Sequence, residues 1–450
     1  MTARSGQLTR RDLLTDLYWT AVQAAAPGPA LRAALAGRTT PPGRRIHLLA
    51  LGKAALPMAE TAVAVLAEQG TAPVGGLLVV PEPAVTPHPN LLVAVGQHPQ
   101  PGTGSLAAAE QLASAVAAVE PGDEVWVLLS GGTTSLVGAP IPSITTGDLA
   151  ALYRLLLGSG LDITAMNRVR KRFARWAGGR LAAALAHAHV KSFTISDVIG
   201  DDLGAIGSGP CVPDPSSAAD IRTVLEAAQL WDRVPLALRS HLDDVEQGRA
   251  AETPKPDHPA FAATKTTLIA SNRLALDAVL GRARSLGYRS VLVNAALAGE
   301  AAVVGHQIAA ILLGYNATNL SGAQVGEMNK DAVLVWGGET TVTLTPDAGL
   351  GGRSQELALA AAEVLDGTPG SGVLLLAAGT DGRDGPTDAA GGFAEPNTWN
   401  TVRRAGRDPA SDLAHHRSHA ALEAAGALFT TGMTGTNVMD LVIGIVPVPA

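Results

Sequence analysis

The stretch "IHLLALGKAALPMAETAVAVLAE" (residues 46–68) decides the fold class of this chain. It opens with a short apolar run, "IHLLAL" (46–51), continues through a Gly-Lys turn, and ends in an Ala/Leu/Val-rich stretch that predicts a helix over 54–68. The run is continuously apolar, so the predicted strand is buried on both faces. A buried strand followed at once by a helix is typical of an α/β fold with a parallel sheet.

The same pattern recurs through the first half of the chain. The sequence predicts strands over 46–51, 76–80, 91–95, 125–129 and 192–196, and helices over 54–68, 105–119, 147–157 and 166–187. An amphipathic helix over 11–25 precedes them. The prediction for the N-terminal half is therefore a Rossmann-like parallel sheet covered by helices.

The second half predicts a mixed sheet with flanking helices. Its strands are expected over 266–271, 290–295, 332–336, 340–345, 373–378 and 441–446. The tetrapeptide "GGET" (337–340) between two of them looks like a hairpin turn. Between the halves, the proline-rich "TPKPDHP" (253–259) is typical of a linker. We therefore expect an N-terminal domain over 1–250 and a C-terminal domain over 251–450, in agreement with a length too great for one ordinary domain.

Composition excludes several classes of function. The net charge of −7 and the absence of long Lys/Arg runs argue against nucleic-acid binding, which needs a basic surface, and 3% aromatic residues offer few stacking platforms. No apolar run approaches the ~20 residues that span a bilayer. The single cysteine, Cys211, cannot form an internal disulfide and fits a reducing compartment. We expect a cytoplasmic protein that binds neither membranes nor nucleic acid.

Candidate anion-binding groups follow two predicted strands of the first half. Lys53 comes directly after the strand over 46–51, where α/β sheets bind ligands, and its charge suits a phosphate or carboxylate. The alternative is a solvated lysine. The loop after the strand over 125–129 could hold an anion with hydroxyl and N–H groups, or be an ordinary turn. Its residues are Ser130, Gly131, Gly132, Thr133, Thr134 and Ser135.

Three further candidates lie at a strand end or beside a turn. Asp197 follows the strand over 192–196, where a carboxylate can hold Mg²⁺ or accept a proton from a substrate hydroxyl; the alternative is a turn or cap role. Arg353 begins a predicted helix, where a cation is unfavourable unless an anion is bound beside it. Glu339 lies at the predicted turn.

The loop "GTDGRDGPTDAAGG" (379–392) holds three aspartates whose repulsion a cation would offset. Asp381 and Asp384 lie nearest the preceding strand, so we predict that they bind Mg²⁺, whereas Asp388 mainly caps and holds the loop. Asn437, in "TTGMTGTNVMDL" (430–441), could bind a polar ligand or cap its own loop. Together these groups form an inventory for phosphoryl transfer, although a sugar-phosphate isomerase or a binding protein could use a similar set.

Nine stretches, in order along nearly the whole chain, resemble the glycerate 2-kinase family, whose C-terminal part is called the MOFRL domain. They are "GKAALPMAE", "LLSGGTTSL", "MNRVRKRFARWAGGRLA", "ISDVIGDDLGAIGSGPCVPDP", "ETPKPDHPAF", "GGETTVTL", "GGRSQELALAAA", "AAGTDGRDGPTDAAGG" and "TGMTGTNVMDL". The resemblance implies ATP- and Mg²⁺-dependent phosphorylation of D-glycerate at its 2-hydroxyl. It also implies an active site in a cleft between two α/β domains, with Lys53 and Arg353 as its cations and Asp197 as its acid.

Two other functions stay open. Members of the family also carry the label hydroxypyruvate reductase, but this sequence has no strand–GxGxxG–helix pattern for a nicotinamide cofactor. A non-catalytic sensor of sugar acids is the second alternative. The sequence leaves a homodimer open.

Overall fold

The computed structural model describes residues 9–41, 43–315 and 331–447, which form two compact units. Residues 27–269 make up the first, here called the parallel-sheet unit. The second, the mixed-sheet unit, combines the chain before residue 27 with the chain from residue 270 onward. Each unit has its own six-stranded sheet.

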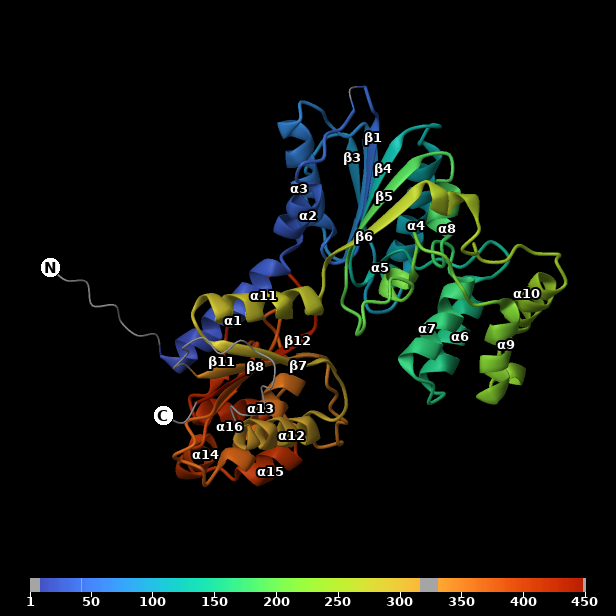
Figure 1. Cartoon of the computed structure of the whole chain (residues 1–450). Coiled ribbons are helices and arrows are strands. Elements are labelled where there is room, and N and C mark those ends of the chain that lie inside the picture. The colour runs from blue at the N-terminus through green and yellow to red at the C-terminus, as the bar shows by residue number, and fades with distance from the viewer. Residues whose placement is uncertain (1–8, 42, 316–330, 448–450) are drawn as a thin grey trace. The chain divides into compact units, whose positions relative to one another are not determined.

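The parallel-sheet unit confirms the Rossmann-like prediction. Its strands run in the order β3-β2-β1-β4-β5-β6 (Figure 1), and all neighbours from β3 to β5 pair in parallel. This order is that of dinucleotide-binding folds, in which strand order reverses between β1 and β4. The strands are β1 (Ile46–Leu51), β2 (Gly75–Val80), β3 (Leu91–Val95), β4 (Glu124–Leu129), β5 (His189–Ile195) and β6 (Thr264–Ala270).

Helices cover both faces of this sheet. The helix α3 (Ala55–Glu68) packs on β1 and β2, and α4 (Thr103–Ala117) packs on β2 and β3 from the opposite face (Figure 1). All six residues of β1 are buried, and Leu49 and Leu51 share a core with Leu112 of α4. Burial on both faces explains why the sequence of β1 is apolar throughout rather than alternating.

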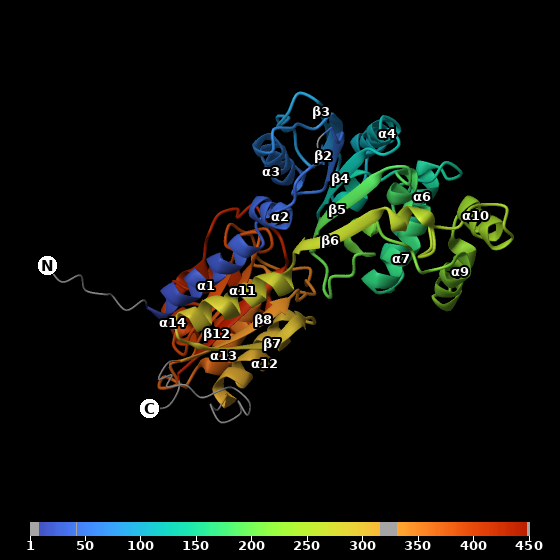
Figure 2. The same ribbon diagram turned by 45° about the horizontal axis from the view of Figure 1, so that its top comes forward.

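A separate group of helices follows β4. The helices α6 (Thr146–Leu157), α7 (Ile163–Phe173), α9 (Ala218–Ala227) and α10 (Leu236–Glu246) share a core of their own (Figure 2). The prediction of one helix over 166–187 is wrong, because α7 ends at Phe173 and α8 (Arg180–Ala184) is a second helix. Gly178 and Gly179 between them have φ values of 57° and 81°, which break a right-handed helix.

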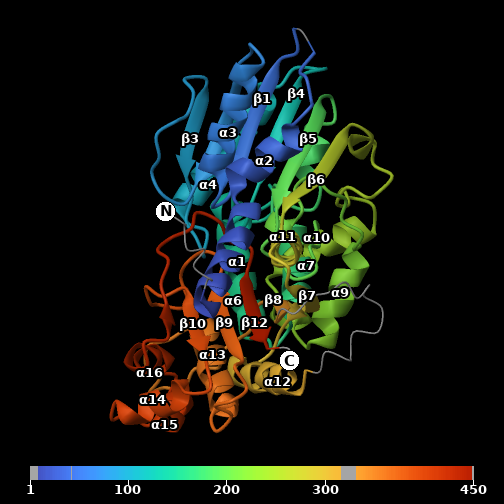
Figure 3. The same ribbon diagram turned by 60° about the vertical axis from the view of Figure 1, so that its left-hand side comes forward.

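The mixed-sheet unit has the strand order β11-β10-β9-β12-β8-β7 (Figure 3). Only β7 and β8 pair in parallel, and the other neighbours are antiparallel, as the mixed-sheet prediction requires. The strands are β7 (Arg289–Leu297), β8 (Ala332–Gly338), β9 (Leu374–Gly379), β10 (Gly391–Ala394), β11 (Leu428–Phe429) and β12 (Asp440–Val446). The helices α12 (Ala301–Gly314) and α13 (Arg353–Leu365) pack against each other, and both contribute to the core of this unit.

The predicted hairpin at "GGET" is wrong. The strand β8 is hydrogen-bonded to β7 on one side and to β12 on the other, so no position is left for a strand that folds back on it. Residues 340–345 form no strand, and Thr341 makes only an isolated bridge to Glu300. The short strands β10 and β11 were not predicted, because two to four residues carry no clear pattern.

The division of the chain differs from the predicted boundary at 250/251. The strand β6 adds to the edge of the parallel sheet, and Thr253 donates a hydrogen bond to Asp214 of the same unit, so 253–259 is not a linker between the units. The helix α1 (Arg10–Ala24) packs on α11 (Asn272–Ser285) in the mixed-sheet unit. Within the described residues, no helix is long and apolar enough to cross a membrane.

Candidate active site

Lys53 lies at the edge of the parallel sheet where β1 and β4 end. Its backbone N–H donates to the carbonyl of Gly131 (2.9 Å) and so joins the loop after β1 to the loop after β4. Its side chain is exposed and makes no ion pair or hydrogen bond with the described residues. The strand order reverses between β1 and β4, which is where sheets of this kind bind ligands. Lys53 therefore lies at the edge where sheets of this kind bind ligands, and its charge has no ion-pair partner among the described residues.

Asp197 comes from the end of β5 and lies against Gly131. A Cβ atom at Gly131 would be only 1.9 Å from Oδ2 of Asp197, so this glycine is required by the carboxylate. Burial raises the pKa of Asp197, whereas its own backbone N–H and the charge of Lys53 act in the opposite direction. The structure thus brings together Lys53 and Asp197, two residues 144 positions apart that sequence reasoning placed at separate strand ends.

The loop after β4 uses most of its hydroxyls internally. Ser130 accepts the backbone N–H of Ala54 (2.9 Å), Thr133 lies within hydrogen-bond distance of two backbone carbonyls, and Ser135 donates to the carbonyl of Gly132 (3.1 Å). The hydroxyl of Thr134 pairs with Ser208 (2.9 Å). The side chains of this loop therefore hold its shape, and an anion would meet mainly its backbone.

His98 is a member of this group that sequence reasoning missed. A Cβ atom at Gly132 would be 3.1 Å from Cδ2 of His98 and 3.3 Å from Cγ of Lys53, so both side chains lie over this glycine. Partial burial and the charge of Lys53 lower the pKa of His98. His98 lies three residues beyond β3, so the strand-end rule that selected Lys53 could have selected it too.

A second group surrounds Arg353, the first residue of α13. Its guanidinium holds Asp440 through two hydrogen bonds (2.6 and 3.0 Å) and contacts Glu339 at 2.6 Å. Burial alone would lower the pKa of Arg353, but the bond to Asp440 and the nearby carboxylates raise it above its ordinary value. The anion that sequence reasoning expected beside this cation is supplied by the protein itself. Asp440 was missed: the sequence prediction placed it in the loop over 430–441, directly before the strand over 441–446, and the structure makes it the first residue of β12.

Asp384 caps α13 from another segment. Its buried carboxylate accepts the backbone N–H groups of Ser354 (3.1 Å) and Gln355 (2.8 Å), which the side-chain-free N-cap Gly352 cannot do. Burial raises the pKa of Asp384 to about 6, although these hydrogen bonds oppose the rise. Sequence reasoning expected Asp388 to cap the Ala-rich turn that follows it, but the chain there leads into β10 and no helix begins, so that assignment is wrong.

The remaining predicted residues lie in neighbouring loops. One oxygen of Asp381 accepts the N–H of Arg383 (3.0 Å), and its other oxygen has no hydrogen bond to the described residues. Asn437 accepts the N–H of Met439 (3.1 Å), which has a left-handed φ of 67°. Across residues 9–41, 43–315 and 331–447, no three His, Cys, Asp or Glu side chains are arranged to hold a metal ion. Of the two aspartates predicted to bind Mg²⁺, Asp381 keeps a carboxylate oxygen without a hydrogen bond to the described residues, whereas both oxygens of Asp384 accept one.

Comparison with known proteins identifies close relatives along nearly the whole chain. Residues 13–243 match the domain of unknown function DUF4147, and residues 332–440 match the MOFRL family. A glycerate 2-kinase of Pyrococcus horikoshii is 35% identical over 413 residues, which cover 89% of this chain and 87% of the relative. A protein of Agrobacterium vitis, provisionally named a hydroxypyruvate reductase, is 36% identical over 435 residues, covering 96% and 94%. The crystal structure of a glycerate kinase from Thermotoga maritima matches with a TM-score of 0.85 at 33% identity, covering 97% of this chain and 99% of that one.

Proposed function

Because this chain belongs to the glycerate 2-kinase family, we propose that it is a phosphotransferase that uses ATP to phosphorylate the 2-hydroxyl of D-glycerate, giving 2-phospho-D-glycerate and ADP. One structural observation carries the proposal. Lys53, a cation without a partner among the described side chains, stands beside Asp197 where the strand order of the parallel sheet reverses. Phosphoryl transfer needs such a cation for phosphate oxygens and such an acid for a hydroxyl proton.

Lys53 and Asp197 have complementary roles in this proposal. Lys53 binds an oxygen of the transferred phosphoryl group and stabilises the charge that develops there. Asp197 accepts the proton of the attacking hydroxyl. Burial raises its pKa, which brings a carboxylate closer to the range in which general bases work near neutral pH.

Arg353 is the second cation of the proposed reaction, which therefore draws on groups from both units. Asp440 and Glu339 hold its guanidinium from one side, while its side chain is still 36% exposed. A guanidinium fixed in this way can bind the carboxylate of glycerate or a phosphate without first losing conformational freedom. Glu339, Asn437 and the backbone of the loop over 130–135 are proposed to line the nucleotide.

The proposed cofactor is Mg²⁺ bound to ATP. Mg²⁺ in kinases is held by one or two carboxylates together with substrate phosphates, and it neutralises phosphate charge. Asp381, with one free oxygen, fits the role of protein ligand, whereas both oxygens of Asp384 are occupied by backbone N–H groups of α13. We propose a cytoplasmic location, in accord with a single buried cysteine.

The proposal is tested by the identity of the product. Purified protein with ATP, Mg²⁺ and D-glycerate should supply enolase directly, because enolase dehydrates 2-phosphoglycerate and not the 3-isomer. L-glycerate and the Lys53→Ala variant serve as controls. A signal that appears only after phosphoglycerate mutase is added would place the phosphate on the 3-hydroxyl. NADH oxidation with hydroxypyruvate would favour the reductase, and glycerate binding without turnover would favour the sensor.

A further inference from the structure

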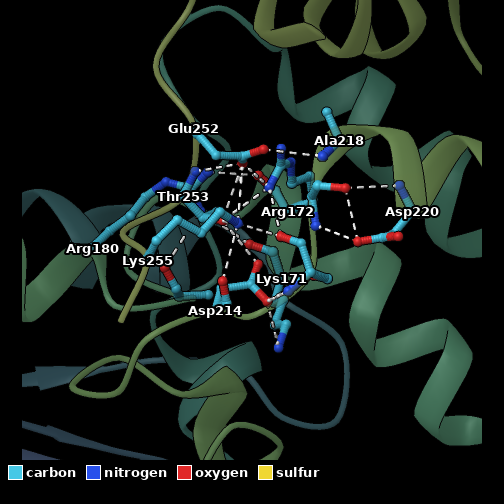
Figure 4. Close-up of polar contacts among 12 residues, drawn as sticks. Lys171, Arg172, Arg180, Asp214, Ala218, Asp220, Glu252, Thr253 and Lys255 are labelled. Atoms are coloured by element: carbon cyan, nitrogen blue, oxygen red, sulfur yellow. Dashed lines mark hydrogen bonds and ion pairs between the residues drawn. The ribbon is translucent and has the colours of Figure 1, made fainter. Parts of the chain in front are cut away.

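A cluster of buried charges lies in the parallel-sheet unit, outside the Lys53 group. It joins the end of α7 to α8 and to the segment before η3 (Pro259–Ala262), as Figure 4 shows. We call it the basic cluster. Its members are the cations Lys171, Arg172, Arg180 and Lys255 and the carboxylates Asp214 and Glu252.

The two carboxylates do not balance the four cations. Asp214 pairs with Lys171 (3.1 Å), and Glu252 pairs with Arg172 and lies 3.6 Å from Lys255. Both carboxylates are thus already shared among three cations, and positive charge remains in surplus.

Arg180 has no carboxylate partner among its hydrogen bonds. Its guanidinium donates to backbone carbonyls at the end of α7, among them those of Lys171 (3.1 Å) and Arg172 (2.8 Å). These bonds give Arg180 a structural role, because a cation stabilises the C-terminal end of a helix. They do not neutralise its charge.

Arg172 gives an independent sign of a missing partner. Its side chain is 1% exposed, and its Nε and Nη2 atoms have no hydrogen-bond acceptor. Buried polar groups are nearly always paired, and an unpaired one points to an ion or a water that completes it. The third nitrogen of the same group, Nη1, donates to Thr253 (2.9 Å) and contacts Glu252, so the guanidinium reaches the wall of the adjoining pocket.

Burial and the surplus of positive charge affect the pKa values of groups in and beside the basic cluster. Burial and the charge of Arg172 lower the pKa of Arg180 to about 10. Burial, Arg180 and Arg172 lower the pKa of His241, and burial lowers that of Lys255. An anion at this place would relieve the repulsion among the cations.

A pocket of about 650 Å³ adjoins the cluster. Arg180, Thr253, Lys255 and His258 are among the residues that line it, and Arg172 stands behind Thr253. Two acids, Glu252 and Asp257, also line the pocket. Glu252 is paired with Arg172, whereas Asp257 is exposed and its charge disfavours an anion. The pocket has room for a small ligand with several oxygens.

We propose that this pocket binds a small oxyanion of the phosphate class, held by Arg180 and Lys255 and attracted by the buried charge of Arg172. Guanidinium and ammonium groups are the usual protein partners of such an anion. The ammonium of Lys255 donates to the carbonyls of Asp214 (3.0 Å) and Ser216 and to the hydroxyl of Thr253 (2.9 Å), so a bound anion would replace one of these acceptors. The site shares no residue with the Lys53–Asp197 group. Its occupation can be measured without any turnover and does not depend on the proposed reaction.

Thermal unfolding with inorganic phosphate is the first test. Wild type, Lys53→Ala, Lys255→Gln and the control Lys265→Gln, which changes an exposed lysine of β6, are unfolded in phosphate and in chloride of equal ionic strength. A ligand that binds only the folded state raises Tm, here by an expected few degrees, about 3–6 °C, at saturating phosphate. The rise should appear in wild type, Lys53→Ala and Lys265→Gln and be lost in Lys255→Gln.

The pattern of Tm changes across the four proteins distinguishes binding in this pocket from binding elsewhere. An equal rise in all four proteins would show a nonspecific salt effect, and a rise that disappears only in Lys53→Ala would assign phosphate to the candidate active site. No rise in any protein would also overturn the proposal. Lys255→Arg, which keeps the charge, should restore the rise and so rules out misfolding as the cause of the loss in Lys255→Gln.

Calorimetric titration of the Lys53→Ala protein then identifies the source of the anion. The Kd for inorganic phosphate should increase on the order of tenfold to a hundredfold when Lys255→Gln is added, the scale of one charge-assisted contact. Tighter binding of 2-phosphoglycerate than of phosphate would identify a phosphorylated metabolite, and equal binding would identify the free ion. A Kd that Lys255→Gln leaves unchanged would contradict the site.

Discussion

Lys53, which follows a strand, and Arg353, which begins a helix, are the two candidate cations of this chain, and the protein holds them differently. Lys53 lies beyond β1 and has no ion-pair partner among the described residues. Arg353, at the start of α13, forms ion pairs with Asp440 and Glu339. The ammonium of Lys53 is free to meet a ligand. The guanidinium of Arg353 is already oriented, so the acids that neutralise it also fix its direction.

This difference determines what each residue contributes to the fold. Removing the side chain of Lys53 breaks no hydrogen bond or ion pair among the described residues. Removing Arg353 leaves Asp440, which is 7% exposed, without its counter-charge, and an unpaired buried charge is costly. Substitution of Lys53 should therefore lower activity without lowering stability, whereas substitution of Arg353 should lower both.

The largest expected effect is at Lys53. Lys53→Ala should lower kcat/KM for glycerate phosphorylation by a factor on the order of 10²–10³, the scale of one preorganised electrostatic contact. Its Tm should match that of wild type. Lys265→Ala, at an exposed lysine on β6, is the matched control and should change neither quantity. Near-normal turnover of Lys53→Ala would remove this residue from the proposed mechanism.

Arg353→Lys should have a smaller effect on catalysis and a visible one on the fold. A lysine keeps the charge but cannot hold Asp440 through two hydrogen bonds, so we expect kcat/KM to fall by a factor on the order of 10–10². Tm should fall as well. Steady-state kinetics and thermal unfolding, with Arg403→Lys at the exposed pair with Asp366 as control, check both effects. A catalytic loss at unchanged Tm would make Arg353 resemble Lys53 and would contradict the contrast drawn here.

The strand-end rule explains which parts of the two sites could be predicted from sequence. Lys53 and Asp197 each come directly after a predicted strand, so their location at one edge of the parallel sheet could be inferred. His98 obeys the same rule, but it lies three residues beyond β3, an edge strand that is only partly buried. The rule was not applied to it, and only packing over Gly132 shows its proximity to Lys53.

The partners of Arg353 could not be inferred, because they depend on long-range packing. Asp440 lies 87 residues from Arg353 in the sequence, and Asp384 lies 30 residues from the helix end that it caps. Sequence reasoning considered only the residues that follow Asp388 and expected it to cap them, whereas the cap of α13 comes from Asp384. The hairpin at "GGET" failed for the same reason, since the position beside β8 belongs to β12 from the end of the chain.

The aspartate loop offers a smaller test of the contrast between free and engaged acids. Asp381→Asn removes the charge of the loop carboxylate that lies nearest the end of β9 and keeps one oxygen without a hydrogen bond to the described residues. It should raise the Mg²⁺ concentration for half-maximal activity several-fold, on the order of 3–10-fold. Asp388→Asn, at an exposed aspartate of the same loop, is the control and should leave the Mg²⁺ curve unchanged. Activity against Mg²⁺ at fixed free ATP measures both. Coincident curves for wild type and Asp381→Asn would exclude Asp381 as a metal ligand.

The smallest effect concerns Asp384 and appears as a dependence of stability on pH. Burial raises the pKa of Asp384 from 3.8 to about 6, so between these values the folded protein holds a proton that the unfolded chain has released. Asp384 therefore favours the fold most at low pH, and its contribution falls as pH rises from about 4 to 6. A shift of roughly two pKa units limits this change to about 3 kcal/mol.

Asp384→Asn cannot titrate, so it isolates this contribution from those of other acids. The gap is the free energy of unfolding of the variant minus that of wild type. It should increase as pH rises from 4 to 7 and be constant above pH 7. Urea unfolding of both proteins across this range measures this difference, and Asp388→Asn, at an exposed aspartate of the same loop, is unfolded alongside them as a control. A gap for Asp384→Asn that is flat, or that moves the other way, would mean that the N–H groups of α13 stabilise the ionised carboxylate more strongly than burial opposes it. Asp384 would then be an ordinary charged cap, already ionised across the lower part of this pH range and close to Arg353 throughout it.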